Sequence, residues 1–362
     1  MKKVLIVNCG SYFVNGISNV ICTYLGAFDS DDFCFYATAY GDIDPRYGAI
    51  FEKRHVRVIP VPNRRKRPFS YLLHLRSIIK REGIDVIHIH GNSGTMFFET
   101  FVAKRCGVRN IIVQSHNSSC SFPFLFGPGT FFTELMKKNA THCLAVSKLV
   151  GDWLFRENYL VVNNAIQIER FLFDEKKRAE LRSRMGIADD VCVIGHVGCF
   201  NRQKNQSFLL AVFSEFLKIN HKSVLILIGD GPDFGKIKRK ASELGIEDNV
   251  FFLGKLDDVN YYYNVFDVFV LPSLWEGLGV VCIEAQANGL PCVVSDVVAN
   301  DARCSDRFFV YDLSKSARSW AEMIAGVYTQ KFHRDDELLP LISSKGFDIN
   351  NEAGKLLALY NV

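Results

Sequence analysis

Two carboxylates and a glycine-containing turn stand close together between residues 271 and 296. Glu276 and Glu284 are eight positions apart, and Ser273, Gly277 and Gly279 occupy the turn around the first of them. An apolar run at residues 268–271 precedes the turn. A helix-forming run at 280–288 follows it, and a second apolar run comes next at 292–294. This order predicts a strand, a turn, a helix and a second strand.

The chemistry of such a turn suits a sugar nucleotide. The first N–H groups of a helix have no partners inside it, and with the helix dipole they favour an anion such as phosphate. Glu276 falls at the turn, and Glu284 lies about one helical turn further in, on a face that can border the same crevice. Two carboxylates there offer strong acceptors for sugar hydroxyls. An ordinary βα unit with two surface glutamates is the alternative that these residues alone leave open.

The wider segment carries a family resemblance. Residues 276–296, EGLGVVCIEAQANGLPCVVSD, resemble the E-x7-E signature of the family 4 retaining glycosyltransferases, and the match includes FDVFVLPS at 266–273. The resemblance covers nearly the whole chain, closely in the second half and loosely in the first. It implies a GT-B fold and transfer of a sugar from a nucleotide diphosphate donor, with retained anomeric configuration and no metal ion.

A second anion-binding signal lies at residues 194–210, IGHVGCFNRQKNQSFLL. Lys204 precedes a predicted helix, where its charge would add to an anion site, although a surface lysine near a helix start is the simpler alternative. The segment resembles the family's diphosphate loop, G-R-x(4)-K, and Lys204 matches the lysine. Cys199 replaces the arginine, and a lost charge-assisted hydrogen bond is worth about 1.5–3 kcal/mol. We expect Arg202 to compensate; a weakened enzyme and a non-catalytic protein are the alternatives.

The resemblance assigns further roles. The implied catalytic set is Glu276, His116 and Lys204. The implied donor-binding set is Gly16, Arg202, Lys204, Gly254, Lys255, Glu276, Gly277, Leu278, Gly279 and Glu284. Within it, the chain around Gly254 borders the nucleobase, Glu284 binds the ribose, and Glu276 meets the sugar and distal phosphate. We expect Glu276 to orient the donor electrostatically rather than attack it, because the leaving phosphate can itself accept the acceptor's proton.

The first half of the chain offers weaker signals. The loop GSYFVNG ends at Asn15 and Gly16, where the family usually has Gly-Gly, and both residues tolerate a positive φ. His116 follows a predicted strand; a solvated loop residue is the plain expectation, whereas the resemblance implies contact with the transferred sugar. His88 and His90 alternate along a strand, and we expect them to pack rather than to bind a metal, because no carboxylate is spaced with them.

The elements that position these residues alternate along the chain. Apolar runs predict strands at residues 4–7, 34–37, 56–61, 86–89, 111–113, 143–146, 191–197, 224–228, 250–253, 268–271 and 292–295. Helix-like segments separate them, for example at 17–25, 69–81 and 95–106. Such alternation predicts parallel sheets covered by helices, and 362 residues fit two domains better than one.

We therefore predict an α/β protein of the GT-B class with two Rossmann-like domains facing a cleft. The acceptor-side domain is expected at 1–165 and the donor-binding domain at 166–344, with a terminal helix at 345–362 returning to the first. A hinge is expected near 164–173, followed by a charged connector at 173–186.

Composition restricts the compartment and the partners. Hydrophobic residues make up 48% and charged residues 23% of the chain, as in globular proteins with packed cores. No run approaches the roughly 20 apolar residues of a membrane span, and MKKVLIVNCG is too short in apolar residues for a signal peptide. The eleven cysteines are scattered without a C-x2-C pair, which favours buried thiols in a reducing compartment over disulfides or a zinc site. We expect a cytoplasmic protein.

The first 150 residues carry an excess of positive charge. They hold 19 Lys and Arg against 10 Asp and Glu, although the whole chain has a net charge of only +4. Four consecutive basic residues open PNRRKRPFSYLLHLRSIIKR, at 62–81, and SFPFLFGPGTFF, at 121–132, is rich in phenylalanine. This combination suits an anionic membrane surface and a lipid-linked acceptor at the inner face of the cytoplasmic membrane. A solvated charge run beside a buried aromatic loop is the alternative. Neither the charge nor any module indicates nucleic-acid binding.

The sequence is compatible with three functions. The first is a retaining glycosyltransferase that adds a sugar to a glycan, lipid-linked or not, in bacterial surface polysaccharide synthesis. The second, suggested by Cys199, is a non-catalytic protein that binds nucleotide sugars or activates a partner. The third and weakest is a sugar-nucleotide epimerase, whose two-domain fold is similar.

Overall fold

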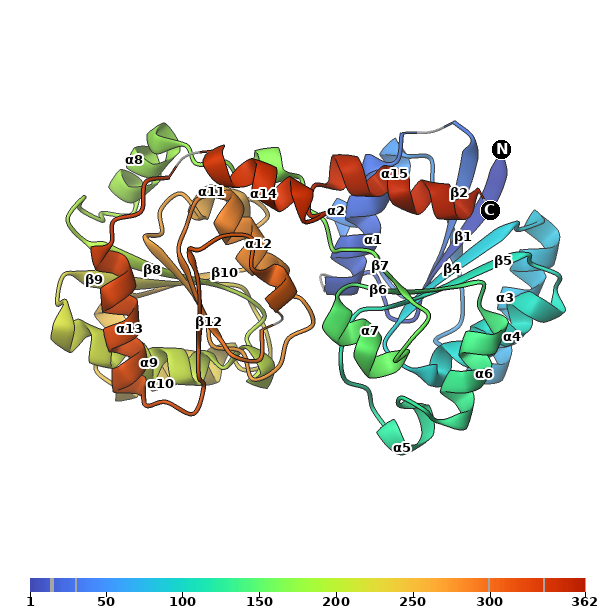
Figure 1. Cartoon of the computed structure of the whole chain (residues 1–362), viewed down its shortest axis with the longest axis horizontal. Helices are drawn as coiled ribbons and strands as arrows, with labels where there is room; N and C mark the ends of the chain where they lie inside the picture. Colours follow the sequence, from blue (N-terminus) through green and yellow to red (C-terminus); the bar gives the residue numbers. More distant parts are fainter. Residues whose placement is uncertain (14–15, 30, 299, 335, 362) are drawn as a thin grey trace. The chain divides into compact units, whose positions relative to one another are not determined.

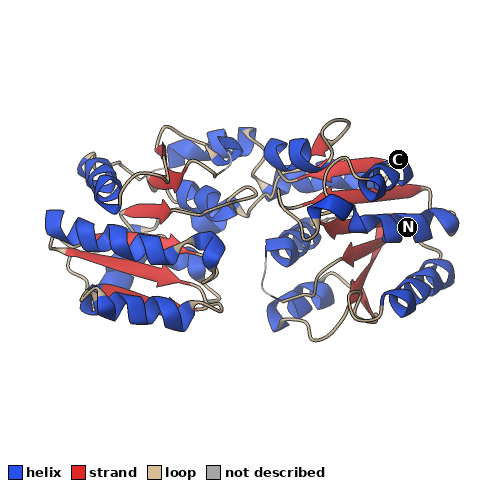
Figure 2. Cartoon of the chain, turned by 90° about the horizontal axis from the view of Figure 1, so that it is seen from below, coloured by secondary structure: helices blue, strands red, loops and turns tan. Residues whose placement is uncertain are grey.

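The computed structural model describes residues 1–13, 16–29, 31–298, 300–334 and 336–361. The chain forms two compact units, Met1–Ile166 with Asp348–Val362, and Gln167–Phe347 (Figure 1). We call them the N-terminal and C-terminal units. Each contains one sheet in which every pair of neighbouring strands is parallel, with helices on both faces (Figure 2). The predicted α/β class with two parallel-sheet units is confirmed.

The sheet of the N-terminal unit has, within the described residues, seven strands in the order β3-β2-β1-β4-β5-β6-β7. Their bounds are β1 Lys2–Asn8, β2 Phe33–Ala39, β3 Arg57–Pro60, β4 Val86–Gly91, β5 Asn110–Ser115, β6 His142–Ala145 and β7 Leu160–Val161. Side chains alternate across the sheet, so Val4 and Ile6 join one core and Leu5 and Val7 join the other.

Two layers of helices complete these cores. One core receives residues of α1, α2 and α15, and the other receives residues of α3, α4, α6 and α7. The helices are α1 Gly16–Ala27, α2 Pro45–Lys53, α3 Pro68–Glu82, η1 Gly94–Met96, α4 Phe97–Arg105, α5 Pro123–Phe126, α6 Phe131–Asn139, α7 Lys148–Leu154 and α15 Ile349–Tyr360.

The last helix, α15, belongs to the N-terminal unit although it is the final element of the chain. Tyr360 is buried and its ring packs edge-on against Phe28 and Phe33. The backbone of the same turn accepts hydrogen bonds from the side chains of Lys2 and Asn110. The sheet of the N-terminal unit is therefore covered on one face by a helix from the opposite end of the sequence.

The C-terminal unit holds, in its described part, a six-stranded sheet in the order β10-β9-β8-β11-β12-β13. The strands are β8 Cys192–Val197, β9 Ser223–Ile228, β10 Val250–Gly254, β11 Val268–Leu271, β12 Cys292–Ser295 and β13 Phe308–Tyr311. The helices are η2 Ile168–Phe171, α8 Glu175–Arg184, η3 Arg202–Lys204, α9 Gln206–Ile219, α10 Phe234–Glu243, η4 Glu247–Asn249, α11 Val259–Tyr262, α12 Val280–Ala287, η5 Asn300–Ala302, α13 Ala317–Thr329, η6 Asp336–Leu338 and α14 Leu339–Ser344.

Most of the charged connector expected at 173–186 is helix α8. Asp174 caps the helix by accepting from the backbone N–H groups of Lys176 and Lys177. Arg178 pairs with Asp267 at 2.6 Å, and the fully buried Arg182 donates to three backbone carbonyls. These charges therefore tie the helix to the unit, whereas a charge-rich sequence alone resembles an exposed linker.

Two strands escaped the sequence prediction, β7 and β13. Strand β7 has only two residues, and both are exposed at the edge of the sheet. Strand β13 has only four residues, FFVY, of which Phe308 is buried and Val310 is exposed. Both strands are short and lie at sheet edges. Apolar runs this short cannot be distinguished from parts of a buried helix by their pattern alone.

Candidate active site

Lys204 and Glu276 form an ion pair in the C-terminal unit. Lys204 Nζ lies 2.6 Å from Glu276 Oε2, and both side chains are more than four-fifths buried. Ser273 Oγ donates to the same carboxylate oxygen at 3.1 Å, and Gln203 Nε2 donates to the other oxygen at 3.3 Å. The carboxylate therefore accepts hydrogen bonds from three side chains and is held in one orientation.

The loops that carry this pair are joined to each other. The backbone N–H of Leu274 donates to the carbonyl of Gln203, and the Asn205 side chain donates to the carbonyl of Pro272. Gly198 lies under the stem of Lys204, since a Cβ at this glycine would stand 3.2 Å from Lys204 Cγ. The glycine at the end of β8 thus lets the lysine lie close against the backbone on its way to Glu276.

Cys199 and Arg202 both lie on the exposed surface of this loop. Partial desolvation of the thiol by the surrounding loop raises the pKa of Cys199 above its ordinary value, so the thiol is neutral at pH 7. Arg202 is the first residue of η3, the 3-10 turn that also contains Lys204. The compensation expected from Arg202 stays a prediction.

The predicted turn-and-helix at the phosphate site has the expected form. Gly279 has a positive φ of 76° and precedes α12, while Gly277 and Leu278 are buried in the turn. Glu284 lies within α12, where burial raises its pKa above the ordinary carboxylate value. The hydroxyl of Tyr263 donates to Glu284 Oε2 at 2.6 Å. The helix bounds confirm the prediction to within one residue.

Gly254 is the last residue of β10 and Lys255 follows it, at the carboxyl end of a strand as the sequence indicates. Gly254 has a positive φ of 65°, and its carbonyl accepts from the N–H of Gly229 at 2.8 Å. Gly229 in turn cannot carry a Cβ, which would lie 2.1 Å from the carbonyl oxygen of Gly198. The strand ends of β8, β9 and β10 therefore lie next to one another, and Lys255 is exposed beside them.

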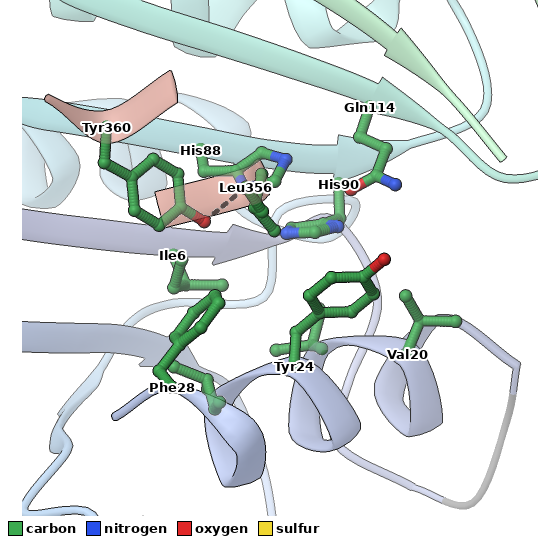
Figure 3. Close-up of a pocket in the computed structure, with 11 residues that line it drawn as sticks. Ile6, Val20, Tyr24, Phe28, His88, His90, Gln114, Leu356 and Tyr360 are labelled. Carbon is green, nitrogen blue, oxygen red and sulfur yellow. Dashed lines mark hydrogen bonds between the residues drawn. The ribbon is translucent and has the colours of Figure 1, made fainter. Parts of the chain in front are cut away.

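His116 belongs to the N-terminal unit, where it is part of a histidine row. Its Nε2 lies 3.0 Å from Nδ1 of His90, whose ring centroid is 4.0 Å from that of His88. His88 Nδ1 shares a hydrogen bond of 2.8 Å with the hydroxyl of Tyr360 on α15 (Figure 3). Gln114 lines the same small pocket as His88 and His90. The plain expectation that His116 is a solvated loop residue is wrong, because both ring nitrogens are buried or bonded.

The histidine row is uncharged at neutral pH. Burial lowers the pKa of His88 and of His116 to about 3 and lowers that of His90 well below its ordinary value. A pair of neutral imidazoles shares one proton in its hydrogen bond, so His90 constrains the tautomer of His116. The Nδ1 atom of His116 has no hydrogen-bond partner within the described part of the chain. The expectation that His88 and His90 pack in the core is confirmed.

Gly16 is the exposed first residue of α1, and a Cβ there would meet nothing within 4 Å. Packing therefore does not require glycine at this position. Asn15, which the sequence pairs with Gly16 in the glycine-rich loop, lies outside the described residues.

A phenylalanine face, defined by Phe98, Phe101, Phe122, Phe124 and Phe131, covers part of the N-terminal unit. Exposure reaches 98% for Phe124, 76% for Phe122 and 72% for Phe131. The face is built on α4, on α6 and on the segment around α5, and α6 packs against both α4 and α5. The alternative of a buried aromatic loop is therefore wrong for these side chains.

The basic run beside this face is partly structural. Arg64 donates to both carboxylate oxygens of the buried Glu99, so it is not available to a partner. Arg65, Lys66 and Arg67 are exposed just before α3, which packs on α4. Three of the four consecutive basic residues thus remain at the surface.

The sequence singled out the two glutamates and Lys204 but missed Gln203 and Tyr263 as their partners. Gln203 adjoins Lys204, and this position is the only feature of the sequence that could have indicated its contact with Glu276. Tyr263 lies 21 residues before Glu284 in a run of three tyrosines, which reads as ordinary core. Among the described residues, no group of three or more His, Cys, Asp or Glu side chains is placed to hold a metal ion. No helix in the same residues is long and apolar enough to cross a membrane.

The two units and the returning terminal helix define the GT-B class of fold. The crystal structure of Anabaena Alr3699/HepE in complex with UDP-glucose matches with a TM-score of 0.80 at 18% identity, over 99% of this chain and all of that one. A model described as "Glycosyl transferases group 1" matches residues 177–335, and "Glycosyltransferase Family 4" matches residues 14–170.

Sequence similarity extends beyond these models. The putative glycosyltransferase EpsF of Bacillus subtilis is 32% identical over 306 residues, which cover 82% of this chain and 79% of that protein. The UDP-Gal:alpha-D-GlcNAc-diphosphoundecaprenol alpha-1,3-galactosyltransferase of Escherichia coli is 24% identical, with 80% and 78% covered. The chain therefore belongs to the group 1 glycosyltransferases of family 4.

Proposed function

We propose that this protein is a retaining glycosyltransferase that moves a sugar from a nucleotide diphosphate donor to a glycan acceptor in bacterial surface polysaccharide synthesis, without a metal ion. The observation that carries the proposal is the buried Lys204–Glu276 pair beside the N-terminus of α12. A lysine and the N-terminal end of a helix dipole attract phosphates, while the carboxylate offers acceptors to the sugar. The UDP-glucose complex of Alr3699/HepE and the UDP-Gal donor in the name of the E. coli relative support a UDP-sugar as the donor class.

Glu276 acts in this proposal as an orienting and electrostatic group. Its carboxylate already accepts from Lys204, Ser273 and Gln203. Three donors stabilise the negative charge and reduce its nucleophilicity, which disfavours a covalent glycosyl-enzyme at this residue. The leaving phosphate then takes the acceptor's proton on the same face of the sugar, which retains the anomeric configuration.

The acceptor in this proposal is lipid-linked and is reached at the inner face of the cytoplasmic membrane. The E. coli relative acts, by its name, on a sugar carried by diphosphoundecaprenol. The phenylalanine face, with Arg65, Lys66 and Arg67 nearby, offers apolar side chains to the acyl region and positive charge to anionic head groups.

A second candidate function rests on Cys199. Its neutral thiol stands where the family has arginine, so a protein that binds nucleotide sugars without turning them over is the competing proposal. Incubation with UDP-, GDP- and ADP-sugars without acceptor, followed by chromatography, separates the two. Release of free nucleotide diphosphate supports the transferase. Binding without any product supports the second candidate, and an isomerised donor would indicate an epimerase and contradict both.

A further inference from the structure

Tyr263 supports Glu284 from outside the E-x7-E motif. The tyrosine follows α11, and its hydroxyl donates to Glu284 Oε2 at 2.6 Å while lying 3.4 Å from the carbonyl of Val281. In the described part of the chain, no lysine or arginine forms an ion pair with Glu284, so this phenol is its hydrogen-bond donor. The other glutamate of the motif, Glu276, is held by the ammonium group of Lys204 instead.

The phenol is held rigidly. The Tyr263 side chain is fully buried, and its ring packs edge-on against Phe171 and Phe266 and lies tilted against Phe269. Its carbonyl accepts from Arg334 Nη2 at 2.8 Å. A residue fixed on both its ring and its backbone places its hydroxyl at one point, so Glu284 loses its own rotamer freedom when it bonds there.

We propose that Tyr263 is a positioning residue for the donor: it orients the Glu284 carboxylate through Oε2 and leaves Oε1 to accept hydrogen bonds from the ribose hydroxyls. This inference rests on the proposed function, in which Glu284 meets the ribose. A neutral phenol suits this task, because a cation at Oε2 would withdraw negative charge from the atom that must accept from neutral hydroxyls.

The hydrogen bond also favours the ionised form of the carboxylate, because it lowers the pKa of Glu284. Burial raises the pKa of Glu284, and the Tyr263 hydrogen bond opposes that rise, as do the more distant charges of Arg170 and Lys204. Loss of the phenol therefore moves the pKa of Glu284 further upward. As the solution is acidified, a variant without this phenol protonates Glu284, and so loses ribose binding, at a higher pH than the wild type does.

The test is a double-mutant cycle with nucleoside diphosphates as probes. UDP, GDP and ADP are titrated calorimetrically into the wild type, Tyr263→Phe, Glu284→Gln and the double variant, at pH 8 and pH 6. We expect Tyr263→Phe to weaken binding of the preferred probe about tenfold at pH 8 and more at pH 6. In the Glu284→Gln background the same change should have little further effect, because the partner carboxylate is absent.

Matched controls separate positioning from packing. Tyr263→Phe keeps the buried ring, and Tyr311→Phe removes a hydroxyl from another ring of the same unit, one that packs on Trp320. The inference is overturned if Tyr263→Phe weakens binding equally in both backgrounds, or if it behaves like Tyr311→Phe. A wild type that binds none of the three probes would instead contradict the proposed function on which the inference rests.

Discussion

Lys204 and Glu276 meet at 2.6 Å although 72 residues separate them in the sequence. Both side chains are largely buried, so each charge depends on the other for its solvation. The pair joins the loop after β8 to the turn before α12. These are the two segments in which the sequence predicts anion binding. The ion pair and the hydrogen bonds from Ser273 and Gln203 hold the Glu276 carboxylate in one orientation.

Removal of one partner should therefore affect both stability and binding. We expect Lys204→Ala to lower the free energy of unfolding of the C-terminal unit by about 3 kcal/mol, because it leaves a buried carboxylate unpaired. We also expect it to weaken UDP binding at least tenfold. The double variant Lys204→Ala/Glu276→Gln should recover most of the stability but not the binding. Chemical denaturation and calorimetry measure the two effects, with Lys218→Ala, from an exposed pair, as control. Equal stability of the single and double variants would contradict the prediction.

Cys199 and Arg202 can be tested together in the diphosphate loop. Cys199→Arg restores the family's arginine and should tighten UDP binding about tenfold, because it adds charge-assisted hydrogen bonds to phosphate. Arg202→Ala should weaken binding if the exposed arginine compensates for the thiol, and should matter less once Cys199→Arg is present. Arg239→Ala, an exposed arginine on α10, is the control. An unchanged affinity of Arg202→Ala for UDP would contradict the hypothesis that Arg202 compensates for Cys199.

Glu284→Gln should stabilise the protein while it weakens, without abolishing, the binding of the donor nucleotide. The folded-state pKa of Glu284 lies above its ordinary value, so the folded chain binds this proton more tightly than the unfolded chain. The contribution of Glu284 to the free energy of unfolding therefore falls as the pH rises from the ordinary pKa of a glutamate to the raised pKa of the folded state. Above the raised pKa the ionised, buried carboxylate is fully unfavourable. We expect Glu284→Gln to raise Tm at pH 7 and to have a smaller effect at pH 4. Glu247→Gln, on the exposed η4 turn, should change neither property. A lower Tm for Glu284→Gln at pH 7 would be the contrary outcome.

The histidine row should make the N-terminal unit sensitive to acid. The pKa values of His88 and His116 are lowered to about 3, while an unfolded histidine titrates near about 6.5. Below that pH the unfolded chain binds more protons, so stability falls with pH by up to about 1.4 kcal/mol per pH unit for each buried histidine. His88→Gln should flatten the dependence of Tm on pH between 6.5 and 4, whereas the exposed His74→Gln should not. An unchanged slope in His88→Gln would exclude this origin.

The phenylalanine face should control binding to anionic lipid. We expect the wild type to float with vesicles that contain phosphatidylglycerol and not with vesicles of phosphatidylcholine alone. Phe124→Ser/Phe131→Ser should abolish flotation at all salt concentrations, because it removes apolar contacts. Neutralising Arg65, Lys66 and Arg67 should abolish it mainly at physiological salt.

The control for this experiment carries the same chemical change in the other unit. Leu244→Ser and Leu341→Ser replace exposed apolar residues of the C-terminal unit and should leave flotation intact. A wild type that stays at the bottom of the gradient with phosphatidylglycerol would rule out the membrane surface.

The sequence alone determined the fold class and most of the strands. Buried parallel strands read as continuous apolar runs, and the glycines of the turn before α12 carry a local requirement for positive φ that is visible without coordinates. The sequence could single out Glu276 and Lys204 because they lie near such turns, and Glu284 because it follows Glu276 by eight residues. The edge strands β7 and β13 were not predicted, because apolar runs as short as theirs cannot be distinguished from parts of a helix without coordinates.

Tertiary structure decided which residues support which. Tyr263 reaches Glu284, and Tyr360 reaches His88 across 272 residues, through packing that no local spacing encodes. The same holds for Arg182. Its charge is typical of a solvated linker, but the structure shows that it donates to backbone carbonyls. Local sequence specifies backbone conformation and which faces are apolar, whereas the partner of a buried polar group depends on how distant elements pack.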